Sequence, residues 1–293
     1  MNFSSTSHTI KDWLLYAVIQ LKDAHVSSAS LDAELILAHC LAVNRTWLVA
    51  HGNKTLAPPI EKSAGALLAR RLKREPIAYI LGHKEFYGRK FIVTPDVLIP
   101  RPESETMIEL LKELISAQKY KNNRSKGQTL SDLPTTLVDV GTGSGCLGIT
   151  AKLEIPGVHV ILSDVSPAAL TIAQQNANTL TATVTIVKSD LLSYFQPPNS
   201  HFDIILANLP YVDESWERSP ETDHEPALAL FADNHGLELI NTLLDQAPGH
   251  MPSGGYILLE ADPVQHAAII AQGAQNGLVL ETVRDYIVVL KKS

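Results

Sequence analysis

Four consecutive residues, Asn208, Leu209, Pro210 and Tyr211, carry groups that could hold a planar nitrogen nucleophile. The lone pair of an amide or aromatic amine is delocalised, so a site must hold and polarise such a nitrogen with acceptors aimed at its two N–H groups. Asn208 offers a side-chain oxygen, Leu209 offers a carbonyl held extended by the following proline, and Tyr211 offers a flat ring. Because Asn and Pro are also common turn residues, these four residues alone leave an ordinary strand-to-loop exit open.

A glycine-rich turn lies earlier in the chain, between a short apolar strand at 136–140 and a predicted helix near 146–153. The order of strand, glycine turn and helix is the one that nucleotide-type cofactors require. Glycines let the backbone approach the ligand, and the helix start presents unpaired N–H groups. The predicted cofactor-binding turn consists of Gly141, Thr142, Gly143, Ser144 and Gly145.

Acidic residues end the next two predicted strands. The strand at 158–164 closes with Asp164, from which a carboxylate can bind ribose hydroxyls. The strand at 184–189 is followed by Asp190 and Leu191. Each Asp alone could be a helix cap or a turn former, but the order of the three strand ends favours a cofactor site.

Two cofactor classes fit this unit, dinucleotides and S-adenosylmethionine. A dinucleotide turn has Gly or Ala at its third small position, where this chain has Cys146. The crowded Gly-x-Gly-x-Gly form, with Asp139 two residues before it, resembles the first motif of class I S-adenosylmethionine-dependent methyltransferases. That resemblance implies that Asp190 and Leu191 lie beside the adenine. The eleven histidines show no paired spacing that suggests a metal site.

Three longer stretches of sequence indicate which methyltransferase family the chain resembles. Residues 74–82 read Arg-Glu-Pro-Ile-Ala-Tyr-Ile-Leu-Gly, residues 98–105 read Leu-Ile-Pro-Arg-Pro-Glu-Ser-Glu, and residues 225–232 read Glu-Pro-Ala-Leu-Ala-Leu-Phe-Ala. With these segments the chain resembles the HemK-type protein-(glutamine-N5) methyltransferases. That family has an Asn-Pro-Pro-Tyr cradle, from which Leu209 departs. Further departures are Glu-Ala-Asp at 260–262 for the usual Glu-Ile-Gly, and a last hairpin without the family's Gly-Arg-Asp-Arg turn.

The resemblance implies methyl transfer from S-adenosylmethionine to the glutamine side-chain nitrogen of the Gly-Gly-Gln motif in class I peptide-chain release factors. The implied catalytic residues are Asn208, Leu209, Pro210 and Tyr211, and Asn208 also faces the cofactor methyl. One alternative is a nucleic-acid adenine-N6 or guanine-N2 methyltransferase with the same cradle. Another is a non-catalytic or dinucleotide-dependent cofactor-binding protein.

Charge and composition favour a protein substrate. The net charge of −7 divides into +3 for residues 1–85 and −10 for the remainder, and an acidic catalytic half would repel a phosphate backbone. Direct nucleic-acid binding is therefore not expected, and the basic run at 70–74 is interpreted as a solvated helix face.

No apolar run approaches the roughly twenty residues that span a bilayer. The two cysteines lie far apart, which excludes a disulfide framework and is compatible with a reducing compartment. We therefore expect a cytoplasmic protein without membrane contact, and we also expect a monomer.

Apolar spacing predicts the domains. Residues 1–78 are expected to form a helical substrate-recognition domain, residues 79–100 a hairpin linker, and residues 101–293 the methyltransferase domain. In the first domain Ser30 is predicted to cap the second helix, Pro58 to open the fourth and Pro76 to end it. A polar surface loop is predicted at 120–134.

The expected fold is α/β, a doubly wound, Rossmann-like sheet of seven strands whose last two pair as an antiparallel hairpin, as in the resembled fold. Parallel strands bring their carboxyl ends to one edge, so the glycine turn, Asp164, Asp190 and Asn208 are predicted to converge there. The strands are expected near 136–140, 158–164, 184–189, 202–207, 255–260, 278–284 and 286–291.

Overall fold

The computed structural model describes residues 8–126, 135–196 and 201–293, and its internal contacts divide the chain into two compact units. Unit 1 contains residues 1–82 together with Ser219–His224, and unit 2 contains His83–Arg218 and Glu225–Ser293. None of the helices in the described part of the chain combines the length and apolar character needed to cross a membrane.

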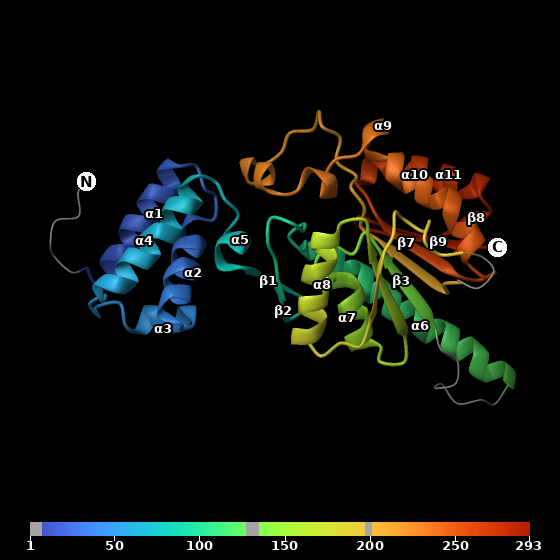
Figure 1. The fold of residues 1–293 in the computed structure, drawn as a ribbon, viewed down its shortest axis with the longest axis horizontal. Helices are drawn as coiled ribbons and strands as arrows, with labels where there is room; N and C mark the ends of the chain where they lie inside the picture. The colour runs from blue at the N-terminus through green and yellow to red at the C-terminus, as the bar shows by residue number, and fades with distance from the viewer. Residues whose placement is uncertain (1–7, 127–134, 197–200) are drawn as a thin grey trace. The chain divides into compact units, whose positions relative to one another are not determined.

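Unit 1 is a bundle of short helices around an apolar core. The helices are α1 (Ile10–Asp23), α2 (Ala29–Leu41), α3 (Arg45–Ala50), α4 (Pro58–Leu72) and α5 (Ile77–Leu81) (Figure 1). Thr9 caps α1 with a capping box that involves Asp12. Trp13 and Leu21 of α1 are buried with Ile36 of α2 and Leu68 of α4, so the core comes from one stripe of each helix.

Two boundary predictions in unit 1 are wrong. Helix α2 begins at Ala29, one residue before Ser30, and the hydroxyl of Ser28 donates to Asp32 instead of capping a backbone amide. Helix α4 ends at Leu72, well before Pro76, because Arg74 has a φ of +66° that an α-helix cannot continue. Pro76 instead caps α5, so the start of the predicted linker is helical.

The basic run at 70–74 is not simply a solvated helix face. Arg71 is 4% exposed and donates to Asp32 at 2.7 Å and to Glu221 at 2.8 Å. Arg74 also donates to Glu221, at 2.7 Å. These bonds place the segment Ser219–His224, which includes the short helix η2 (Pro220–His224), in unit 1.

Unit 2 begins with a two-stranded antiparallel hairpin, β1 (His83–Phe86) and β2 (Arg89–Ile92), followed by η1 (Pro102–Ser104) and α6 (Glu105–Lys126). Because α6 continues to Lys126, the loop predicted at 120–134 is wrong for residues 120–126, and residues 127–134 lie outside the described part.

A seven-stranded sheet forms the centre of unit 2, in the order β5-β4-β3-β6-β7-β9-β8. Neighbours from β5 to β7 pair in parallel, and β9 pairs antiparallel with both β7 and β8. This confirms the predicted fold class. The strands are β3 (Thr136–Val140), β4 (His159–Asp164), β5 (Thr185–Lys188), β6 (Ile204–Ala207), β7 (Tyr256–Glu260), β8 (Leu278–Arg284) and β9 (Ile287–Lys292).

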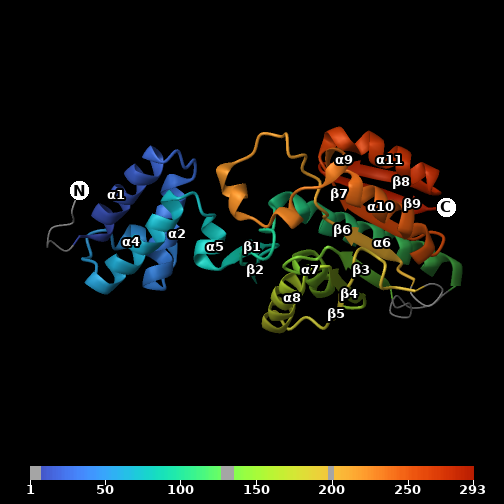
Figure 2. The same ribbon diagram turned by 45° about the horizontal axis from the view of Figure 1, so that its top comes forward.

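Helices cover both faces of this sheet (Figures 1 and 2). Alternate residues of a strand enter opposite cores, as Leu137 and Val138 of β3 do. One core includes residues of α6, α7 (Cys146–Glu154) and α8 (Pro167–Thr179), and the other includes residues of α10 (Glu238–Gln246) and α11 (His266–Gln275). The central strands are therefore buried on both faces, and the polar residues after their carboxyl ends share one edge.

Candidate active site

The glycine turn joins the end of β3 to the start of α7. Gly141 has a φ of +69° and Gly143 has a φ of +53°. Residues with a Cβ atom rarely adopt such positive φ values. The N–H of Thr142 donates to the carbonyl of Ser163 at the end of β4, at 2.9 Å. The space next to Gly143 is open, since a Cβ there would meet no atom within 4 Å. A ligand can therefore approach this backbone closely.

Asp139 of β3 binds both the glycine turn and the first turn of α7. Its buried carboxylate accepts hydrogen bonds from the Thr142 hydroxyl at 2.6 Å and from the N–H of Gly148 in α7 at 2.9 Å. Burial raises the pKa of Asp139 to about 6, although both hydrogen bonds act in the opposite direction. The first turn of α7 is thereby tied to β3.

Asp164 ends β4 beside the turn. One carboxylate oxygen accepts from the N–H of Gly143 and the other from the N–H of Ser166, each at 2.9 Å. Burial raises the pKa of Asp164, and these backbone donors oppose the rise. Two backbone bonds thus fix the carboxylate at the strand end, and its remaining lone pairs can accept from a ligand.

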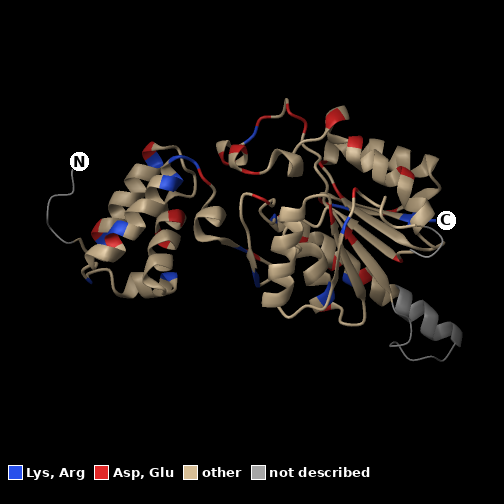
Figure 3. Cartoon of the chain, in the orientation of Figure 1, with Lys and Arg blue, Asp and Glu red and all other residues tan. Residues whose placement is uncertain are grey.

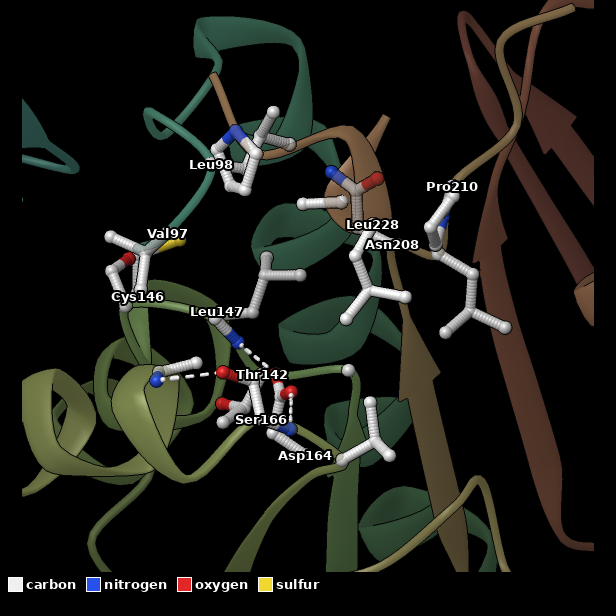
Figure 4. A pocket seen from close by; sticks show the side chains of 18 of the residues that line it. Val97, Leu98, Thr142, Cys146, Leu147, Asp164, Ser166, Asn208, Pro210 and Leu228 are labelled. Carbon is white, nitrogen blue, oxygen red and sulfur yellow. Dashed lines mark hydrogen bonds between the residues drawn. The ribbon is translucent and has the colours of Figure 1, made fainter. Parts of the chain in front are cut away.

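A cavity of about 300 Å³ connects these groups with the end of β6. In Figure 4, Asn208, Pro210 and Leu228 lie on one side of it, and Thr142, Asp164 and Ser166 lie on another. Ten of the predicted site residues line the cavity: Gly141, Thr142, Gly143, Ser144, Asp164, Asp190, Leu191, Asn208, Leu209 and Pro210.

Gly145 and Tyr211 do not line this cavity. A Cβ at Gly145 would lie 2.7 Å from the Ile149 side chain and 3.3 Å from Ala173, so this glycine allows close helix packing. The Tyr211 hydroxyl donates to Glu260 at 3.3 Å, and burial raises the pKa of that hydroxyl. Tyr211 therefore contacts Glu260 and does not line the cavity, and the proposed contact of its ring with the planar substrate group stays a prediction.

Comparisons with known proteins cover most of the chain. Residues 12–82 match the family model described as "PrmC N-terminal domain", and residues 128–224 match "Methyltransferase small domain". A release factor glutamine methyltransferase of Koribacter versatilis is 38% identical over 87% of this chain and 89% of its own length. One of Neisseria gonorrhoeae is 36% identical over 84% of this chain and 85% of its own length. The chain belongs to the release factor glutamine methyltransferase family.

A solved structure supports the fold of this family member. A methyltransferase of Pyrococcus furiosus aligns with a TM-score of 0.50 at 17% identity, covering 77% of this chain and 97% of that protein. At this identity the likeness concerns the fold alone. In the described part of the chain, no group of three or more His, Cys, Asp and Glu side chains is arranged to hold a metal ion.

Sequence reasoning missed several residues of the site. Val97, Leu98 and Leu228 line the cavity with apolar side chains, and Cys146 and Ser166 line it next to the turn. The segments at 98–105 and 225–232 carried the family resemblance, but their spacing alone gave no reason to place them at the cavity. Ser104 also lines it, and its hydroxyl lies between Asn208 and Glu260.

Proposed function

We propose that this chain transfers a methyl group from S-adenosylmethionine to the side-chain nitrogen (N5) of the Gly-Gly-Gln glutamine in class I peptide-chain release factors. Its family membership supports the reaction. The single observation that carries the assignment to residues is the shared cavity, because the glycine turn and Asn208 line the same space. A methyl donor at the turn and a nitrogen acceptor at the end of β6 can meet there.

The residues present fit this cofactor. Open space beside Gly143 and the start of α7 would accept its amino-acid part, and Asp164 would bind the ribose. Asp190 and Leu191 would lie beside the adenine. When bound, the cofactor supplies an electrophilic methyl group on a sulfonium. Asn208 faces the same cavity, as methyl transfer requires.

The cradle acts by holding the glutamine amide. The side-chain oxygen of Asn208 and the carbonyl of Leu209 would accept the two N–H groups, while Pro210 and Tyr211 would shape and support the cradle. Alignment of the nitrogen with the methyl carbon would supply much of the rate acceleration. The methylated nitrogen is strongly acidic, so its proton can leave without a dedicated base.

Charge on the segment after the cradle supports a protein substrate. Residues 213–225 include six acidic residues and one basic residue, which Figure 3 shows as red along the loop between β6 and α9 (Asp233–Gly236). Glu221 pairs with Arg71 and Arg74, and Glu225 pairs with Arg101, so the remaining acidic residues of the segment are the ones that would repel a nucleic-acid backbone. We further propose that the protein is a cytoplasmic monomer and that residues 1–78 form its substrate-recognition domain.

The test uses labelled S-adenosylmethionine with a release factor or ribosomal RNA, and mass spectrometry of the Gly-Gly-Gln peptide. The expected product is a singly methylated glutamine. Asn208→Ala is expected to lower kcat by about 100-fold or more, the usual cost of removing one preorganised polar group. Calorimetry should show unchanged cofactor affinity. Near wild-type transfer by this variant would refute the cradle, and label only in RNA would refute the substrate.

A further inference from the structure

Behind the cradle lies a buried polar network that the proposed reaction does not use directly. Glu260, the last residue of β7, is 1% exposed, and Ser104 in η1 is 2% exposed. The Ser104 hydroxyl donates to Glu260 Oε2 at 2.5 Å. The same oxygen of Ser104 accepts from Asn208 Nδ2 at 3.1 Å. Three segments distant in sequence thus meet at one hydroxyl.

The direction of these hydrogen bonds follows from the carboxylate. An ionised carboxylate can only accept, so the Ser104 proton must point to Glu260. The lone pairs of Ser104 Oγ are then the groups available to Asn208, and only the NH₂ end of its amide can bond to them. The carbonyl oxygen of Asn208 is consequently left for another donor.

We propose that Ser104 and Glu260 are positioning residues that hold the Asn208 side chain with its carbonyl oxygen toward the substrate nitrogen. This inference rests on the proposed function. Without the network, the amide of Asn208 could rotate by half a turn and present its NH₂ group to the NH₂ group of glutamine. Two donors would then face each other, and the cradle would repel the nitrogen it has to hold.

The hydrogen bonds that Glu260 accepts favour its ionised form, whereas burial opposes it and leaves the pKa of Glu260 above its ordinary value of 4.5. Burial raises the pKa of Glu260, and Glu103 acts in the same direction, while hydrogen bonds from Ser104, Tyr211 and Asn208 oppose the rise. The Tyr211 hydroxyl donates to the second carboxylate oxygen at 3.3 Å. The Glu260 carboxylate therefore accepts from both Ser104 and Tyr211. Because Ser104 also accepts from Asn208, the carboxylate links Asn208 to Tyr211, the first and last residues of the cradle.

The decisive comparison is Ser104→Ala against Ser104→Thr. Alanine removes the bridging hydroxyl, whereas threonine keeps it. We expect Ser104→Ala to lower kcat about tenfold, less than loss of the acceptor itself because Asn208 still visits the productive orientation. Affinity for S-adenosylmethionine, measured by calorimetry, should stay within about twofold, since Ser104 acts on the acceptor. Ser104→Thr should restore kcat to within about threefold of the wild type.

A matched control removes a buried hydroxyl elsewhere. Thr150 in α7 is fully buried, and among the described residues its hydroxyl has no hydrogen-bond partner. Thr150→Val should leave kcat unchanged. A kcat for Ser104→Ala equal to that of the wild type would overturn the positioning role, and so would equal impairment of the alanine and threonine variants. The proposed function is judged separately, by whether the wild-type protein methylates the release factor at all.

The variant Glu260→Gln is a second test of the same hydrogen-bond network. Glutamine keeps the shape of the side chain but can donate as well as accept, so Ser104 is no longer forced to point toward residue 260. We expect kcat to fall between the wild-type and Ser104→Ala values, with unchanged cofactor affinity. Wild-type kcat in this variant would show that the carboxylate does not set the direction of the bonds.

Discussion

At the residue scale, Leu209 shows how a departure from the family cradle is accommodated. Its side chain is 4% exposed, and a Cβ at Gly141 would lie 2.8 Å from Leu209 Cδ2. The Leu209 side chain thus fills the space next to Gly141, while its backbone still provides the carbonyl proposed to accept from the substrate amide. The cradle and the cofactor turn are therefore in direct van der Waals contact in this chain.

Asp139 gives a prediction at the same scale. Its pKa is raised from the ordinary 3.8 to about 6 in the folded protein. The folded state then binds more protons than the unfolded state between these values, so this group lowers the unfolding free energy as pH rises from about 4 to 6. In the variant Asp139→Asn, the asparagine side chain could keep an acceptor for Gly148 N–H without the buried charge. The unfolding free energy of this variant relative to wild type should rise over this range by up to about 3 kcal/mol.

Urea denaturation of both proteins at pH 4 and pH 7.5 measures this difference. Carboxyl groups that do not interact with Asp139 titrate alike in the two proteins, so the subtraction isolates residue 139 together with its electrostatic coupling to Asp164. An unchanged difference between the two pH values would mean that Asp139 keeps an ordinary pKa.

At the element scale, Asn176 of α8 joins the hairpin to the glycine turn. Its fully buried amide accepts from the N–H of Ile92 at 2.7 Å and donates to the carbonyls of Ile92 at 3.0 Å and Ser144 at 2.9 Å. Three backbone groups from β2 and the turn are satisfied by one side chain. The hairpin is thereby fixed beside the cofactor turn.

Removal of this side chain should affect both stability and cofactor binding. Asn176→Ala leaves three backbone groups without their partner, which should lower the unfolding free energy by about 3 kcal/mol. Because Ser144 belongs to the turn, affinity for S-adenosylmethionine should also fall, measured by calorimetry. Asn178→Ala, an exposed site on the same helix, should change stability by less than about 0.5 kcal/mol. Equal losses in the two variants would contradict this role.

Local patterns predicted the elements better than the contacts between them. The alternation of apolar strands and helices predicts the sheet and places the glycine turn, Asp164, Asp190 and Asn208 at one edge, because parallel strands align their ends. The bond between Ser104 and Glu260 joins residues 156 positions apart, and no local pattern encodes it. For the same reason no local pattern marks Asn176 as a residue that bonds to Ile92 and Ser144. The end of α4 was mispredicted because Arg74 adopts a left-handed conformation that only the surrounding structure supports.

At the scale of the whole molecule, the chain does not divide at a single point. Ser219–His224 lies far along the sequence from residues 1–82 but belongs to the same compact unit. Burial alone would raise the pKa of Glu221, but hydrogen bonds from Arg74, Ser219 and Arg71 outweigh it and hold that pKa at about 2. A lowered carboxyl pKa stabilises the folded state above its ordinary value of 4.5, and this stabilisation is lost as pH falls through about 2.

Glu221→Gln should therefore loosen this segment at neutral pH. Glutamine is uncharged and cannot accept from both arginines as a carboxylate does, so we expect a loss of about 1–2 kcal/mol and roughly tenfold faster amide hydrogen exchange over 219–224. The difference from wild type should shrink as the pH approaches 2, where Glu221 itself becomes protonated. Glu217→Gln, an exposed change two residues before Ser219–His224, serves as control and should leave exchange over 219–224 unchanged. Equal exchange in both variants at neutral pH would mean that Arg71 and Arg74 do not hold Ser219–His224 in unit 1.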